Sequence, residues 1–96
     1  MNISDQKKLL KLYCRELLAT DATELVSMLA VRQKMSRSDL AERAGKSRSG
    51  LSNVLSGSHN MTLSTLSDLC FTLGYAVKLS AVPLREVKKI KQENYD

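Results

Sequence analysis

The sequence has 96 residues, enough for one small domain and too few for two independent hydrophobic cores. Hydrophobic residues make up 43% of the chain, which is typical of a globular protein, and the scarcity of aromatic residues favours an aliphatic core of packed helices. No apolar run approaches the roughly 18 residues that span a bilayer, and the N-terminus lacks the pattern of a secretion signal. We therefore expect a cytoplasmic protein.

The formal net charge of +5 is concentrated in one part of the chain. Residues 1–30 and 60–83 are each neutral, whereas residues 31–59 carry six basic and two acidic side chains, a balance of +4. A local excess of Lys and Arg suits a phosphate-binding surface, because affinity for DNA comes largely from the release of counterions. A solvated charged face has the same composition, so charge alone leaves both interpretations open.

Two helices are predicted before the basic region. Ser4 can cap a first helix that runs to about Ala19, and Asp21 is the expected N-cap of a second helix that ends near Met35. The residues expected to face inward recur at helical spacing: Leu9, Leu10, Tyr13, Leu17 and Leu18 in the first helix, and Leu25, Val26, Leu29 and Ala30 in the second.

Two short helices follow, joined by a tight turn. Ser36 and Asp39 have the spacing of a capping box and begin a helix through Ala44, after which Gly45 supplies a positive φ. Ser47 caps the next helix, over residues 47–56, and Gly57 ends it. Apolar residues at i, i+3 and i+4 argue against a flexible Gly/Ser linker here: Leu51, Val54 and Leu55.

A last helix and a strand complete the expected elements. Thr62 caps the helix and Gly74 ends it. Its predicted inward residues are Leu63, Leu66, Leu69, Cys70 and Leu73. The apolar period then changes to 2 over residues 75–82, which predicts a strand that Pro83 stops.

The strand predicts a homodimer, because a lone strand has unpaired backbone groups on both edges and a second copy satisfies them most simply. The dimerisation residues expected on one face are Tyr75, Val77, Leu79 and Ala81. The alternative is that residues 75–82 fold back on their own chain or remain without order.

Two short helices joined by a Gly-containing turn form a helix-turn-helix, whose second helix enters the major groove of DNA. The side chains at the start of residues 47–56 suit that role. Arg48 can contact guanine O6 and N7, and Asn53 can pair with adenine or reach a phosphate. Ser47, Ser49 and Ser52 can each contact a base or a phosphate, although Ser47 also serves as a cap. Gly50 costs about 1 kcal/mol of helix propensity relative to Ala, which close approach to DNA or to residues 36–44 would explain.

Residues 36–74 resemble the lambda-repressor-like, XRE-type helix-turn-helix family. The resemblance lies in matching apolar, turn and cap positions: Leu40, Ala41, Ala44, Gly45, Ser47, Leu51, Val54, Gly57, Thr62, Leu63 and Leu66. It implies an all-α fold, a compact bundle of about five short helices, to which the C-terminal β-strand is added. The expected organisation is an N-terminal helical extension (1–20), a helix-turn-helix domain (21–74), a dimerisation strand (75–83) and a charged tail (84–96).

The resemblance also implies a DNA-binding site. The family's contact at the start of the second helix, usually a glutamine, falls on Arg37. Its base-reading positions fall on Arg48, Ser49, Ser52 and Asn53, and its phosphate-contacting loop falls on Ser56, Ser58, His59 and Asn60. Lys46 stands where an apolar turn residue normally packs, which adds a further phosphate ligand and leaves the packing of that corner in doubt.

The order of a helix-turn-helix domain followed by a short strand is similar to that of HigA- and HipB-type antitoxin repressors. This resemblance implies a sequence-specific repressor that binds double-stranded DNA as a homodimer at an inverted-repeat operator, with a cognate toxin as a further partner. A prophage repressor and a restriction-modification controller are the alternatives.

An enzyme is not expected, because the chain has one His, no Gly-rich phosphate loop after a strand and no Cys/His/carboxylate cluster. We expect no metal and no cofactor. Cys14 and Cys70 are not part of a CxxC motif and are interpreted as reduced core residues, with a disulfide or a metal site as the alternative.

Overall fold

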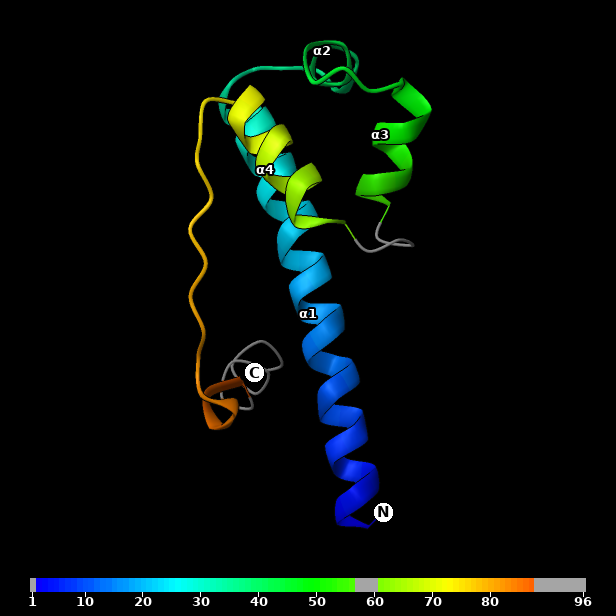
Figure 1. Ribbon diagram of the computed structural model, residues 1–96, viewed down its shortest axis with the longest axis vertical. Coiled ribbons are helices and arrows are strands. Elements are labelled where there is room, and N and C mark those ends of the chain that lie inside the picture. Colours follow the sequence, from blue (N-terminus) through cyan, green and yellow to red (C-terminus); the bar gives the residue numbers. More distant parts are fainter. Residues whose placement is uncertain (1, 57–60, 88–96) are drawn as a thin grey trace.

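The structure, a computed structural model, describes residues 2–56 and 61–87. Its helices within these ranges are α1 (Ile3–Arg32), α2 (Arg37–Arg43), α3 (Arg48–Leu55) and α4 (Leu63–Thr72), and a further helical turn covers residues 84–87. Figure 1 shows α2, α3 and α4 gathered near the C-terminal half of α1, while the N-terminal half extends away from them. The molecule is elongated as a result, with extents of 48 × 23 × 22 Å.

α1 is one continuous helix of 30 residues where the sequence pattern predicts two. Its N-cap is Asn2 and not Ser4, and the Asn2 side-chain oxygen accepts a hydrogen bond from the backbone N–H of Asp5 at 2.8 Å. Asp21 lies inside the helix and caps nothing. The chain has no Gly or Pro near this position, and Thr or Asp inside a helix costs at most about 0.7 kcal/mol, so nothing ends the helix there.

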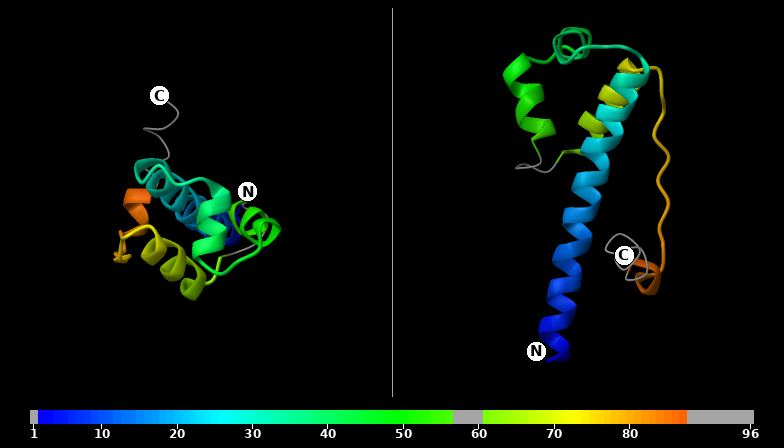
Figure 2. Two further views of the ribbon diagram at one scale, coloured as in Figure 1. Left: turned by 90° about the horizontal axis from the view of Figure 1, so that it is seen from above. Right: turned by 180° about the vertical axis from the view of Figure 1, so that it is seen from behind.

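The all-α architecture is therefore confirmed with one long helix in place of two short ones. The right-hand view of Figure 2, from behind, shows α2, α3 and α4 beside the C-terminal half of α1. Despite its length, neither α1 nor any other helix in the described ranges is apolar enough to cross a membrane.

The predicted caps of the three shorter helices are confirmed. Ser36, Ser47 and Thr62 are the N-caps of α2, α3 and α4. Each side-chain oxygen accepts a hydrogen bond from the backbone N–H three residues further on, at 3.0–3.1 Å. These bonds satisfy N–H groups that have no partner within the helix, and each is typically worth about 1 kcal/mol.

Helices α1, α2 and α4 are each followed by a residue with a left-handed backbone conformation, that is, a positive φ. Gly45 after α2 and Gly74 after α4 have φ values of +70° and +90°, as the sequence predicts. α1 ends in the same way without a glycine: Lys34 has a φ of +55°, and the N–H groups of Lys34 and Met35 donate to carbonyls of the last turn of α1. This pair of bonds is the Schellman arrangement, in which glycine normally occupies the left-handed position.

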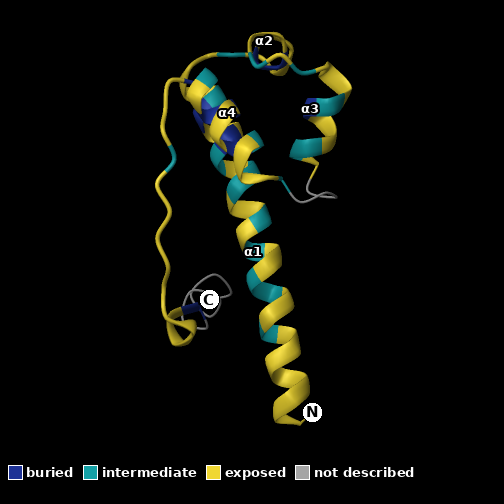
Figure 3. Cartoon of the chain, in the orientation of Figure 1, coloured by how far each residue is buried: buried dark blue, intermediate teal, exposed yellow. Residues whose placement is uncertain are grey.

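The hydrophobic core lies where the four helices meet, at one end of the molecule (Figure 3). All four helices contribute buried residues to it, and Leu73 follows directly after α4: Val26, Leu29, Leu40, Ala41, Leu51, Leu66, Leu69, Cys70 and Leu73. Both cysteines are free, with Cys70 buried and Cys14 half-buried. Burial raises the pKa of the Cys70 thiol, so this cysteine behaves as a small apolar residue.

Three residues predicted to face inward are exposed. Leu9 and Leu18 are 50% and 66% exposed because they lie on the part of α1 that extends beyond the other helices. Leu63 is 70% exposed. It is the first residue of α4, and the buried stripe of that helix begins one turn later, at Leu66.

Residues 75–82 do not form the predicted β-strand. In the described part of the chain no residue belongs to a β-ladder, and residues 75–83 run as a single extended segment beside α4 and α1. A ladder needs a second strand, and the described residues of one chain do not provide one.

The strained end of α1 generates a stability prediction. Replacing Lys34 by Gly should raise the free energy of unfolding by about 0.5–1 kcal/mol, because a left-handed residue with a Cβ costs about 1–2 kcal/mol and the greater freedom of glycine in the unfolded chain offsets part of that gain. Urea unfolding at a fixed protein concentration measures the difference. Lys34→Ala is the matched control and should give no gain, since Ala also has a Cβ. Equal stabilisation by Ala and Gly would contradict this account.

Candidate nucleic-acid interface

The turn between α2 and α3 sets the angle at which α3 leaves the core. The N–H of Gly45 donates to the carbonyl of Glu42 at 3.2 Å, and the N–H of Lys46 donates to the carbonyl of Ala41 at 2.8 Å. The chain then enters α3 directly through its N-cap, Ser47. Helix, tight glycine turn and helix therefore follow one another with no spare residue between them.

α3 has one face in the core and one face in solvent. Leu51 is fully buried, and Val54 and Leu55 are partly buried against the core. The polar residues on the opposite side have the spacing i, i+3, i+4 and i+7, which places them on one face of a helix. We call these four residues the polar face of α3; all are exposed: Ser49, Ser52, Asn53 and Ser56.

Some of these side chains already have partners within the chain. The hydroxyl of Ser47 accepts the capping bond from the N–H of Gly50 at 3.0 Å and lies 3.5 Å from the hydroxyl of Ser49. The hydroxyl of Ser56 donates to the carbonyl of Asn53 at 2.8 Å. Arg48 takes part in none of these bonds and is exposed at the first position of α3. The hydroxyl of Ser47 is thus used to cap α3, whereas the side chain of Arg48 makes none of these bonds and is exposed to solvent.

The electrostatics of the N-terminus of α3 favour an anion. Asp5 and Asp39 lie in the first turns of α1 and α2, but the first turn of α3 contains no acidic residue. The partial positive charge of the helix end is therefore not neutralised locally. Arg48 and Lys46 add two full positive charges beside it. Such an end binds phosphate groups through backbone N–H groups and nearby cations.

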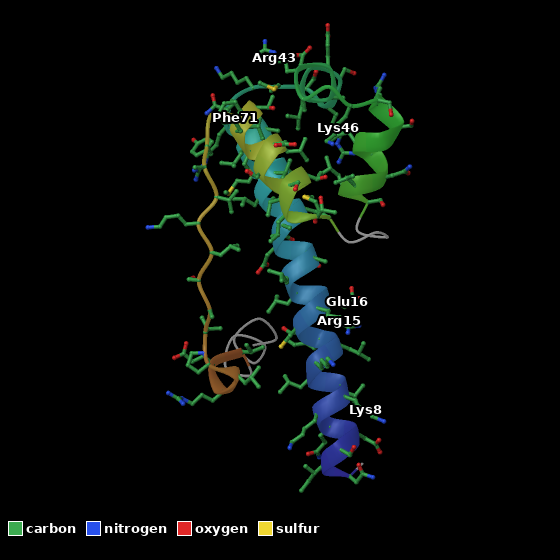
Figure 4. The ribbon with its side chains drawn as sticks, viewed as in Figure 1. Lys8, Arg15, Glu16, Arg43, Lys46 and Phe71 are labelled. Carbon is green, nitrogen blue, oxygen red and sulfur yellow. The ribbon has the colours of Figure 1, made fainter. Side chains whose placement is uncertain are left out.

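The remaining predicted contacts are placed only in part. Arg37 is exposed at the first position of α2, next to its cap. Lys46 is half-buried near the α2–α3 turn (Figure 4), at the corner where an apolar residue was expected. Ser58, His59 and Asn60 lie outside the described residues.

Sequence reasoning omitted Arg43 from the set of contacts. Arg43 is exposed in the last turn of α2 and projects from that helix in Figure 4. Arg43 contributes to the positive charge excess of residues 31–59, and that excess was the sequence signal that could have identified Arg43 as a candidate contact. By contrast, Lys8 and Arg15 lie on the extended half of α1, away from α2 and α3.

A comparison with protein families matches residues 28–79 to the Helix-turn-helix family HTH_3, which covers 52 of the 96 residues. The chain belongs to this family. The protein is accordingly a DNA-binding transcription regulator of the XRE-type helix-turn-helix class, with double-stranded DNA as its partner. The match includes the last turn of α1, all of α2, α3 and α4, and the beginning of the extended segment. Searches of curated proteins and of solved structures gave no match.

Within this helix-turn-helix, Gly50 has a local explanation. A Cβ atom placed on Gly50 would lie 2.8 Å from the Oγ of Ser47. Apart from its chain neighbours and the backbone of its own helix, it would meet no other described atom within 4 Å. Close packing against α2 therefore does not account for the glycine. It leaves room for the capping hydroxyl that holds the start of α3.

This explanation predicts coupling between Gly50 and Ser47. In the native chain, Gly50→Ala should change the free energy of unfolding little, because a helix-propensity gain of about 1 kcal/mol is offset by displacement of a cap worth about 1 kcal/mol. In a Ser47→Ala background, where the hydroxyl is absent, Gly50→Ala should stabilise the protein by about 1 kcal/mol. Denaturant unfolding of the four proteins forms a double-mutant cycle. A coupling energy near zero would show that the cap does not explain the glycine.

Proposed function

We propose that the protein is a sequence-specific transcriptional repressor that binds an inverted-repeat operator as a homodimer. The observation that carries this proposal is the N-terminus of α3, where Arg48 stands beside an exposed polar face and no acidic residue offsets the helix end. Arg48, Ser49, Ser52 and Asn53 would contact bases. Arg37, Lys46, Ser47 and Ser56, together with Ser58, His59 and Asn60, would contact mainly the DNA backbone.

Selection of binding sites from a random duplex library tests this proposal directly. A dimer with two recognition helices about 34 Å apart should select two inverted half-sites with centres about 10 bp apart, or a multiple of that distance. Selection of a single unrepeated site would contradict the dimeric arrangement. Failure to enrich any sequence would contradict sequence-specific binding.

Arg48 provides the sharpest test of the assigned contacts. Arg48→Ala should reduce the discrimination between operator and random DNA by about 1–3 kcal/mol, as expected for loss of a bidentate contact to guanine. Fluorescence anisotropy with both duplexes at one salt concentration measures this quantity. Lys8→Ala, on the extended half of α1, is the control and should leave the discrimination unchanged. The assignment is wrong if Arg48→Ala weakens binding to both duplexes equally.

The homodimer is proposed to form through residues 75–82, with Tyr75, Val77, Leu79 and Ala81 on one face of a shared sheet. The extended backbone of this segment supports the proposal: the N–H of Tyr75 donates to the carbonyl of Cys70, but from residue 76 to 82 no backbone hydrogen bond to another described residue occupies the N–H and C=O groups that a second strand would use. Val77 already packs against the core, which places the segment firmly on the domain.

Proline substitutions test the strand pairing. Val77→Pro should shift the protein from dimer to monomer in sedimentation velocity, because proline removes a donor from the ladder. Lys78→Pro tests the neighbouring donor without altering a side chain in the core, and Lys78→Ala retains that donor and should remain dimeric. A dimer that persists in both proline variants would place the interface elsewhere.

We also propose that the operon encodes a toxin, so that the protein acts as antitoxin and autoregulator. Exposed apolar side chains on the extended half of α1 support a protein partner in addition to DNA: Ile3, Leu9 and Leu12. A prophage repressor or a restriction-modification controller is the alternative and requires no toxin. The neighbouring gene distinguishes them, because an antitoxin should suppress the toxicity of that gene's product when the two are co-expressed.

A further inference from the structure

A row of positive charges lies on the extended half of α1, outside the helix-turn-helix. Lys7, Lys11 and Arg15 recur at i, i+4 and i+8, which places them on one face of the helix, and all three are exposed. We call these three residues the basic stripe of α1. No acidic residue stands three or four positions from any of them, and like charges four residues apart destabilise a helix. The helix therefore carries a repulsion that an anionic partner would remove.

The neutral balance of residues 1–30 conceals the basic stripe. Residues 1–20 carry four basic and two acidic side chains, a balance of +2, and Asp21 and Glu24 bring the total to zero. Both of these acidic residues lie in the C-terminal half of α1. A partner of the extended half therefore meets a positive charge that the count over the whole region does not reveal.

The basic stripe lies on the side of α1 that the other helices pack against. Ala22 follows Arg15 by seven residues and Val26 follows it by eleven, which are close to two and three full turns of an α-helix. Val26 is fully buried in the core, and Ala22 packs against the core. One face of α1 is therefore apolar where α4 and the rest of the domain cover it and basic where it extends beyond them.

Arg15 links the basic stripe to the start of α4. A groove of about 290 Å³ lies where α1, the start of α4 and the extended segment meet, and Arg15, Met61 and Leu63 all line it. In the sequence, Met61 directly follows residues 58–60, which we propose as contacts to the DNA backbone. The first turn of α4 contains no acidic residue, so the partial positive charge of that helix end is not neutralised locally. The stripe thus continues the proposed backbone contacts along α1.

We infer that the basic stripe binds the sugar-phosphate backbone of the same DNA duplex, beyond the bases that α3 contacts. This inference rests on the DNA binding of the helix-turn-helix and does not require the proposed homodimer. The stripe spans about 12 Å at 1.5 Å per residue, which matches the rise of about three or four base pairs. All three residues precede residue 28, where the family match begins. Because phosphates are the same in every sequence, this contact raises affinity without adding discrimination between sequences.

The salt dependence of DNA binding tests the inference. The probe is a duplex that carries the selected binding site and extends two helical turns beyond it on each side. In the double variant Lys7→Gln/Lys11→Gln, the plot of log K against log salt concentration should become shallower by about 1.8, because each lost phosphate contact changes the slope by about 0.9. A fourfold rise in salt should then weaken the native protein about tenfold more than the variant.

The double variant Lys78→Gln/Arg85→Gln is the matched control. It removes the same net charge from two exposed residues, and both lie on the side of α1 and α4 away from α3 (Figure 1). Its salt dependence should equal that of the native protein. Circular dichroism should show unchanged helix content in both double variants, because all four side chains are exposed. An equal change of slope in the two double variants would mean that net charge alone is responsible, and would overturn the inference.

Hydroxyl-radical footprinting on the same duplex locates the contact. The native protein should protect backbone next to the bases that α3 contacts, and Lys7→Gln/Lys11→Gln should lose that added protection while the rest of the footprint remains. An unchanged footprint and an unchanged slope would refute the stripe as a DNA contact, leave the helix-turn-helix function intact and direct the stripe to an acidic protein surface instead. A native protein that binds no duplex would refute the DNA-binding function together with this inference.

Discussion

Gly45 adopts a φ of +70° between α2 and α3, where a side chain would crowd the following carbonyl, and this turn sets the direction of α3. Two backbone hydrogen bonds close the turn onto α2, and Ser47 caps α3 immediately afterwards. Because this closed turn leaves no spare residue between the helices, the orientation of α3 is fixed. Leu51 then lies in the core and the polar face of α3 is exposed to solvent. The surface that we propose to bind DNA depends on this local geometry.

The side chains around α3 divide between fold and function. Ser47 and Gly50 hold the start of the helix, the first because its hydroxyl oxygen accepts the capping bond and the second because it leaves room for that hydroxyl. Arg48 takes no part in that network. An arginine outside the capping network, at a positively polarised helix end, is well placed to bind a phosphate or a base. The small residues within 47–56 therefore have two separate roles. Some of them support the N-cap of α3, and the others form an exposed face of short side chains.

Local signals in the sequence predicted the helix-turn-helix closely. Ser36, Ser47 and Thr62 cap the helices that they were expected to cap, and Gly45 and Gly74 end theirs with positive φ, because each signal acts within a few residues. The same reasoning failed at Asp21, since a residue able to cap a helix is also tolerated inside one. It also failed at Leu18 and Leu63, because helical spacing does not indicate whether an element far away in sequence covers them.

The all-α class, the helix-turn-helix, its caps and the basic character of residues 31–59 all follow from the sequence alone, because capping, glycine turns and charge are properties of short segments. Two features depended instead on how distant segments pack: the extension of the first half of α1 beyond the core, and the groove that α1 forms with α4 and residues 75–82. Helical spacing predicts which residues share a face, but it does not indicate whether another element covers that face. That is why the apolar residues of α1 were predicted to form one core and instead divide between a core and an exposed surface.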